Sequence, residues 1–144
     1  MSVHERSCPS AMPNVTLFKY DKPDLAGRKK SVRVLARTDI ALVAAQVVSD
    51  GGENNLHSHT YLDGFWLVLA GRARFYTTDD VLIADLGPME GVVVPRGCPY
   101  WFERSGDTDL EILQFEASSK QIGNDPSLDR VDHTTRRMPS EADV

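Results

Sequence analysis

Through the middle of the chain, apolar and polar residues alternate in short runs. A repeat of two residues is typical of β-strands that bury one face, because successive side chains point to opposite sides. Turn-forming clusters such as Ser49-Asp50-Gly51-Gly52 and Leu86-Gly87-Pro88 separate the runs. The pattern predicts strands over residues 15–20, 31–36, 40–48, 65–70, 72–77, 81–86, 91–95, 100–104 and 110–116.

Short strands with regular turns, and no sustained helical period, predict an all-β fold: a jelly-roll β-barrel over residues 15–117. The two ends of the chain differ from this region. Residues 1–14 are polar and contain two prolines, so we expect a flexible leader. Residues 118–144 are charged and poor in apolar side chains. This tail is expected to be disordered, to form a short helix around 126–131, or to order against a partner subunit.

Length and charge narrow the class of protein. A chain of 144 residues suggests one domain, and a net charge of −5 argues against nucleic acid or an anionic membrane as partner. No apolar run approaches the roughly 18 to 20 residues that span a bilayer. Cys8 and Cys98 show no spacing that pairs them. We therefore expect a cytoplasmic protein with reduced thiols.

The stretch GENNLHSHTYLDGFWLVLAG, residues 52–71, carries the clearest candidate chemistry. On a strand, His57 and His59 lie on one side and Ser58 on the other. Their imidazoles could converge on one cation at the usual distance of roughly 2.0 to 2.1 Å. The alternative is a pair of histidines at a strand end with no ligand.

The residues around the pair resemble the two motifs of the cupin family. Five residues separate Gly51 from the histidine pair that starts at His57. Gly71 closes the first motif, and Pro95-Arg96-Gly97 matches the centre of the second. The resemblance covers residues 38–117 and implies a double-stranded β-helix, a conical barrel with a pocket at one mouth. It also implies a homodimer in which N-terminal strands cross between subunits, with 15–20 as the candidate strand.

Two of the four usual cupin ligands are changed. The position of the family's metal-binding glutamate falls on Gly64, one residue after Asp63, and that of its second-motif histidine falls on Tyr100. If a bulge absorbs one residue, Asp63 turns inward and completes a metal site with His57 and His59. If the strand is regular, Asp63 points away and Gly64 leaves a gap. Tyr100 either ligates the ion or hydrogen-bonds to substrate or metal-bound water.

The pocket is expected to be largely aromatic. Strand alternation places Gly64, Trp66 and Val68 inward, with Phe65 outward. Apolar cavities with a few polar groups are the usual small-molecule sites. The candidate substrate-binding residues are Gln46, Trp66, Tyr76, Tyr100 and Phe102. The alternative is that these are ordinary core residues.

The resemblance implies a small metal-dependent enzyme, and the aromatic pocket predicts a partly apolar or aromatic small molecule as its substrate in the barrel mouth. Oxygenase, isomerase, lyase and cyclase reactions are all open, and the ion would be Fe, Mn, Ni or Zn. Tyr100 and His59 are the candidate catalytic residues, and they could also move protons without a metal. The alternative is a non-catalytic barrel that has lost its metal and binds or senses a small ligand.

Overall fold

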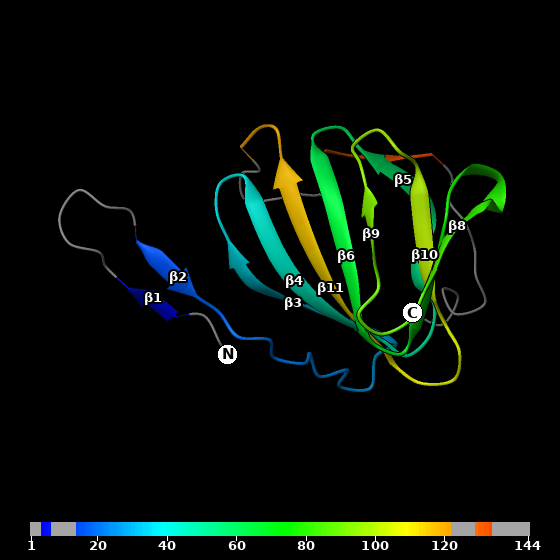
Figure 1. Ribbon diagram of the computed structural model, residues 1–144, viewed down its shortest axis with the longest axis horizontal. Helices are drawn as coiled ribbons and strands as arrows, with labels where there is room; N and C mark the ends of the chain where they lie inside the picture. Colours follow the sequence, from blue (N-terminus) through cyan, green and yellow to red (C-terminus); the bar gives the residue numbers. More distant parts are fainter. Residues whose placement is uncertain (1–3, 7–13, 122–128, 134–144) are drawn as a thin grey trace.

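The computed structural model describes residues 4–6, 14–121 and 129–133. The described chain forms two five-stranded antiparallel sheets and a separate two-stranded ribbon (Figure 1). The first sheet has the order β3 (Lys30–Arg37), β4 (Ala41–Val48), β11 (Leu110–Ser118), β6 (Leu62–Ala70) and β9 (Gly91–Val94). The second has the order β12 (Arg130–Asp132), β5 (Gly52–His59), β10 (Tyr100–Ser105), β7 (Arg72–Tyr76) and β8 (Leu82–Leu86).

The two sheets pack face to face around one main core. Trp66 and Val68 of the first sheet contact Phe75 and Phe102 of the second within this cluster. The rings of Phe75 and Phe102 are stacked with their centroids 5.0 Å apart, and Trp66 lies 5.0 Å from Phe102. Burial of these large apolar side chains is the main force that closes the barrel.

The all-β jelly-roll prediction is confirmed. The expected alternation along β6 is also observed, since Trp66 and Val68 are buried while Phe65 is 43% exposed. The histidine pair lies within a full strand, β5, which the pattern did not separate from the preceding turn. Thr78–Asp80 forms a short 3-10 turn, and no helix among the described residues is long and apolar enough to cross a membrane.

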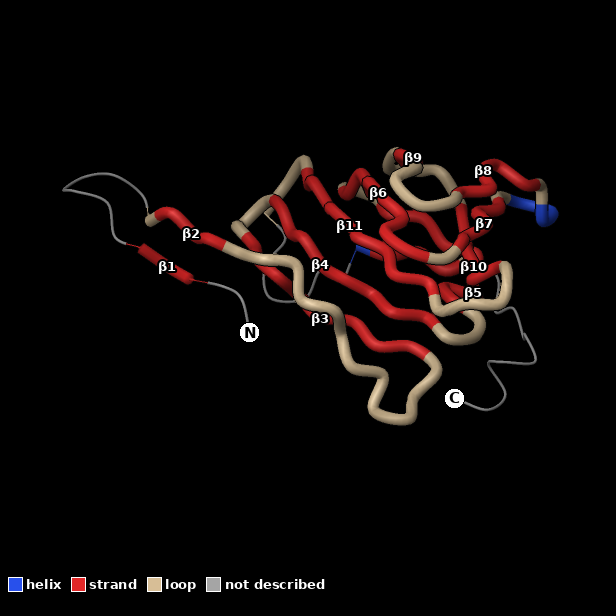
Figure 2. The backbone as a smooth tube through the Cα atoms, turned by 60° about the horizontal axis from the view of Figure 1, so that its bottom comes forward, coloured by secondary structure: helices blue, strands red, loops and turns tan. Residues whose placement is uncertain are grey.

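The two chain ends contribute strands of their own. β1 (His4–Arg6), inside the expected leader, pairs with β2 (Val15–Leu17), and this ribbon projects away from the barrel (Figures 1 and 2). In the tail, β12 pairs antiparallel with β5. Of the short helix expected around 126–131, residues 126–128 lie outside the described residues, and Arg130 and Val131 belong to β12.

A tight turn at Gly71 carries the chain from the first sheet to the second. Gly71 has φ +78°, and a Cβ atom there would lie 2.4 Å from the carbonyl oxygen of Asp109. Gly97 has almost the same backbone angle, φ +82°, but a Cβ there would meet nothing within 4 Å. Substitutions at the two glycines therefore distinguish the free-energy cost of a left-handed backbone from that of a steric clash.

We expect Gly71→Ala to destabilise the protein clearly more than Gly97→Ala. The left-handed conformation costs an alanine about 1 to 2 kcal/mol at either position, and only position 71 adds the overlap with Asp109. Urea unfolding followed by circular dichroism measures both free energies of unfolding. Equal losses in the two variants would contradict the close packing at this turn.

Candidate active site

His57, His59 and Tyr100 lie together on the inner face of the second sheet. Tyr100 of β10 is the antiparallel partner of His57 of β5, and the register shifts by a bulge immediately after it. The ring centroid of Tyr100 is 4.4 Å from that of His57 and 6.5 Å from that of His59. The two imidazoles are 5.3 Å apart and nearly perpendicular. The structure therefore brings together the three residues on which the sequence-based site depends.

His57 is held as a neutral imidazole. Its side chain is 1% exposed, and its Nδ1 atom lies 2.8 Å from the carbonyl oxygen of Asn55. A carbonyl only accepts, so Nδ1 donates and Nε2 is left as an acceptor. Burial lowers the pKa of His57 to about 4, with a further contribution from the Arg130 guanidinium and against the hydrogen bond to Asn55.

His59 has a carboxylate partner that comes from the C-terminal segment. The Nδ1 atom of His59 lies 2.7 Å from Oδ1 of Asp129, and both side chains are largely buried. The second oxygen, Oδ2, accepts the backbone N–H groups of Tyr61 and Leu62 at 3.1 and 3.2 Å. Asp129 therefore joins the β12 segment to His59 and to the turn between β5 and β6.

Two groups near the histidines, Glu116 and Tyr100, lie in surroundings that raise their pKa values. Glu116 lies on β11 opposite Gly64 and is buried; its burial raises the pKa of its carboxyl, against the opposing effect of His59. Burial also raises the pKa of the Tyr100 hydroxyl far above its usual value, and the charges of Glu53 and Glu116 add to the effect. Both environments favour the protonated form.

The prediction that Asp63 faces the histidines is wrong. β6 keeps a regular register with β11 at this point, with Asp63 opposite Ala117 and Gly64 opposite Glu116. Without a bulge, Asp63 points out of the barrel, where it accepts the backbone N–H of Arg96 at 2.8 Å and pairs with the guanidinium at 3.7 Å. The regular-strand alternative therefore holds.

The donor set does not fit a metal centre of the expected kind. Each imidazole leaves one nitrogen for a cation, but two such nitrogens need a third ligand to hold a divalent ion firmly. Among the residues that the structure describes, no group of three or more His, Cys, Asp or Glu side chains is placed to hold one. The metal stays a prediction, and no chemical step below uses it.

The expected substrate-binding residues divide between the barrel interior and other places. Gln46 and Trp66 face inward and are 3% exposed, and Gln46 donates from Nε2 to Gln114 at 2.9 Å. Phe102 is fully buried within the core. Tyr76 does not line the mouth: it stacks on Trp101 at 4.3 Å and donates to Glu103 at 2.8 Å. Side chains alternate along β7, and because Phe75 points into the barrel, Tyr76 points out of it.

Two polar atoms of the interior lack partners within the described part of the chain. They are Oε1 of Gln46 and Nε1 of Trp66. The Trp66 N–H makes no hydrogen bond of normal geometry there, although it lies near enough to Tyr100 to lower the pKa of that hydroxyl slightly. Buried polar groups are normally satisfied, so such atoms are candidates for contact with a ligand or water.

The sequence-based reasoning missed Glu116 and Asp129. Alternation along LEILQFE places Glu116 on the same face as Leu110 and Ile112, so the strand pattern contained its inward orientation. Asp129 precedes a strand of only three residues in a charged segment. Its single apolar residue, Val131, offers too short a pattern to recognise.

Comparison with known proteins supports the fold. No family model matches the chain, and no curated protein matches it. A double-stranded β-helix protein from Klebsiella pneumoniae superposes with a TM-score of 0.60 at 16% identity, over 76% of this chain and 88% of that one. A cupin superfamily protein from Desulfitobacterium hafniense gives 0.53 at 22% identity, over 70% and 84%. The chain thus has the double-stranded β-helix fold seen in cupins.

A third similar structure is of a protein with a named activity. Pac13 of Streptomyces, in a variant with a tyrosine changed to phenylalanine and with uridine, superposes with a TM-score of 0.60 at 14% identity. The match covers 86% of this chain and 97% of that one. Pac13 is described as a nucleoside dehydratase. At this identity the likeness concerns the fold.

The buried His57 makes stability depend on pH in a definite direction. The unfolded chain takes up a proton at His57 near pH 6.5, whereas the folded chain does so only near pH 4. Stability is therefore full above 6.5 and falls as pH drops toward 4, by up to about 3 kcal/mol. We expect His57→Gln to remove this part of the dependence and His133→Gln to retain it. Denaturant unfolding of the metal-free protein at several pH values measures the pH dependence of stability, and an NMR titration measures the pKa of the His57 ring. A ring that titrates near pH 6.5 in the folded protein would contradict its burial.

Proposed function

We propose that this protein is an acid–base enzyme of the lyase or isomerase type, acting on a small molecule in the barrel mouth. The observation that carries the proposal is the inward cluster of His57, His59 and Tyr100, with Glu116 facing it from the opposite sheet. An imidazole nitrogen that carries no hydrogen can accept a proton there, and a phenol or carboxyl group that carries one can donate it.

The surroundings of the four side chains differ, and these differences indicate which group accepts a proton and which donates one. His57 is buried and neutral, and its Nδ1 atom is occupied by Asn55. His59 has a carboxylate beside its Nδ1 atom, which stabilises the charge that forms when Nε2 takes a proton. Burial raises the pKa values of Tyr100 and Glu116, which favours the protonated form of each group. His59 is thus the proposed base, and Tyr100 or Glu116 the proposed acid.

An elimination that uses these groups balances without a further reactant. Nε2 of His59 takes a proton from the carbon next to a carbonyl group, and the electrons of that C–H bond form a C=C bond. The C–O bond to a β-hydroxyl group breaks, and that oxygen takes a proton from Tyr100 or Glu116 and leaves as water. Transfer of the proton from His59 back to the acid, directly or through water, restores the enzyme.

The surroundings favour a flat, partly apolar substrate. Trp66 and Phe75 border Tyr100, with ring centroids 6.3 and 6.2 Å from it. The buried Oε1 of Gln46 and Nε1 of Trp66 offer one acceptor and one donor to a ligand. Pac13, which has a similar fold and is described as a nucleoside dehydratase, makes dehydration the first reaction to test and ring-bearing ligands the first probes.

We expect uridine to bind to the wild-type protein. We also expect the wild-type protein to dehydrate β-hydroxy carbonyl compounds, or to exchange the hydrogen on the carbon next to their carbonyl group with solvent. Ligand-observed NMR detects binding, and proton NMR in deuterated water detects loss of water or uptake of deuterium. His59→Gln and Tyr100→Phe should each lower turnover on the order of 10²- to 10⁴-fold, because each removes a proton-transfer group. Tyr76→Phe is the matched control, since that hydroxyl binds Glu103 away from the cluster.

The same experiment distinguishes the alternative functions. Binding without turnover in any protein sample would support a non-catalytic ligand-binding barrel. Turnover that appears only after addition of Fe, Mn, Ni or Zn, and is lost with a chelator, would restore the metal-dependent enzyme. Equal effects of Tyr76→Phe and Tyr100→Phe would contradict the proposed site.

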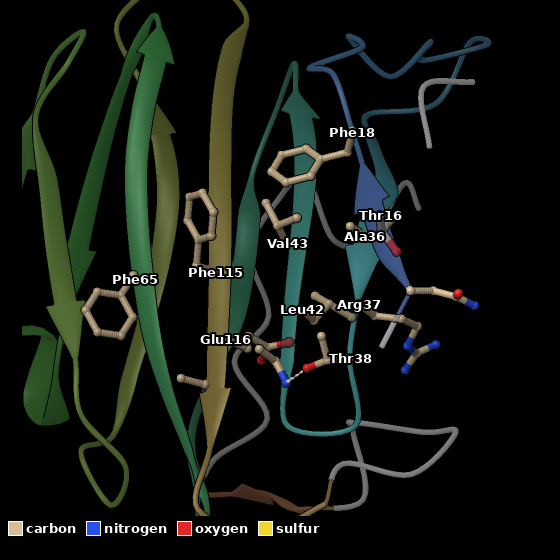
Figure 3. A pocket seen from close by; sticks show the side chains of 13 residues that line it. Thr16, Phe18, Ala36, Arg37, Thr38, Leu42, Val43, Phe65, Phe115 and Glu116 are labelled. Carbon is tan, nitrogen blue, oxygen red and sulfur yellow. Dashed lines mark hydrogen bonds between the residues drawn. The ribbon is translucent and has the colours of Figure 1, made fainter. Parts of the chain in front are cut away.

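We also propose that the protein is a homodimer, because the outer face of the first sheet is apolar and open. Phe65 and Phe115 pair across β6 and β11 and are 43% and 40% exposed. Together with Phe18 and Val43 they line a groove of about 490 Å³ (Figure 3). An apolar surface of this kind is typical of an interface.

The projecting ribbon favours a second copy as the occupant. Val15, Leu17 and Phe18, in and next to β2, are each more than 40% exposed. A two-stranded ribbon is marginally stable by itself, so it needs a surface to pack on. Two copies that exchange ribbons across their open sheet faces would form a self-complementary, two-fold interface.

We expect light scattering to show a dimer for wild-type protein and a monomer for Phe115→Asp. A charge in the middle of the groove would be desolvated on association. Val81→Asp is the control, because Val81 is 56% exposed outside the groove. A monomeric wild-type chain, or a Phe115→Asp variant that stays dimeric and folded, would rule out this interface.

A further inference from the structure

We propose that Asp129 is a positioning residue, which fixes the tautomer of His59 so that Nε2 faces the barrel as the proton acceptor. This role rests on the function proposed above for His59. Asp129 belongs to the segment after the barrel, outside every motif that the sequence offered. The C-terminal segment would thus complete the site.

Both carboxylate oxygens of Asp129 have hydrogen-bond partners, and this arrangement determines which nitrogen of the His59 ring carries the hydrogen. Oδ2 accepts two backbone N–H groups, from Tyr61 and Leu62, so the carboxylate cannot rotate freely. Oδ1 is then directed at Nδ1 of His59, at 2.7 Å. An ionised carboxylate only accepts, so Nδ1 carries the hydrogen and Nε2 is the free acceptor.

The backbone around Asp129 holds it in register with β5. Arg130, the next residue, is the antiparallel partner of His59, and the N–H of Thr60 donates to the carbonyl oxygen of Asp129 at 3.1 Å. Further along, Arg130 pairs with Glu53 at 3.5 Å, and Nε2 of His133 lies 2.8 Å from the hydroxyl oxygen of Ser58. The segment is therefore tied to β5 at several points, and Asp129 is its contact with the site.

Asp129 also acts on the proposed acid. Its negative charge is one of the causes that raise the pKa of Glu116, after burial. One carboxylate thus supports both halves of a proton transfer: it stabilises the imidazolium that forms at His59, and it favours the protonated form of Glu116.

Asp129→Asn tests the role with little change in shape. The remaining oxygen of Asn can still accept from Tyr61 and Leu62, and the amide N–H₂ then faces His59. Because an amide nitrogen only donates, Nδ1 must become the acceptor and Nε2 must carry the hydrogen. We expect the histidine ¹⁵N NMR spectrum to show His59 as the Nδ1–H tautomer in wild-type protein and as the Nε2–H tautomer in the variant.

Turnover is expected to fall on the order of 10²- to 10⁴-fold in Asp129→Asn, with an unchanged apparent affinity for uridine. Asp132→Asn is the matched control: Asp132 lies three residues further along the same segment, binds Arg130 at 2.8 Å, and should leave the His59 tautomer unchanged when replaced. If Asp129→Asn folds poorly, the wild-type spectrum still decides, because an Nε2–H tautomer there overturns the proposal. An unchanged tautomer in Asp129→Asn, or the same change in Asp132→Asn, overturns it too. The spectrum needs no substrate, so it stands apart from any failure of the proposed reaction.

Discussion

The position of β5 between two other strands determines the whole site. β10 lies on one side and sets Tyr100 opposite His57, while β12 lies on the other and sets Arg130 opposite His59. Because side chains alternate along a strand, a shift of one residue in this register would turn both imidazoles out of the barrel. The chemistry therefore depends on backbone pairing on both sides of β5, and not only on the histidine pair itself.

Burial of so many polar groups needs compensation, and the structure provides it through charges at the edge of the barrel. Glu53 is paired with Lys30 at 3.4 Å and with Arg130 at 3.5 Å, so its pKa is lowered although burial alone would raise it. This network joins β3 of one sheet to β5 and β12 of the other. A charge buried without partners would cost far more free energy than a hydrogen bond returns. Within this network the Arg130 guanidinium adds to the effect of burial in lowering the pKa of His57, while the Glu53 carboxylate opposes it.

The fold and part of the candidate site could be predicted from the sequence, and the physical reasons differ from residue to residue. A period of two identifies strands such as β6 and gives the inward direction of Trp66 without further information. The same rule places His57 and His59 on one face. For Asp63 it could not decide between a bulge and a regular strand, because a bulge depends on the partner strand. For Tyr76, the prediction required knowing which residues of β7 face the barrel interior. Only the packing of Phe75 in the core determines this. Asp129 depends on pairing between residues about 70 positions apart, and one apolar residue in β12 gives no local signal for it.

The absence of a side chain at position 64 and the buried carboxyl at 116 are connected by packing. A Cβ atom on Gly64 would lie 3.3 Å from Nε1 of Trp66, so the indole occupies the space that a longer side chain at 64 would need. Glu116 is the direct cross-strand partner of Gly64 and places a buried carboxyl on the same face from the neighbouring strand. The site thus has its inward carboxyl on β11 and an aromatic surface beside Gly64 on β6. Because β11 and β5 belong to different sheets, the Glu116 carboxyl acts on His59 across the barrel interior and not from beside it on one sheet. That geometry suits transfer of a proton across a bound molecule better than joint coordination of a single ion, which agrees with the proposed acid–base function.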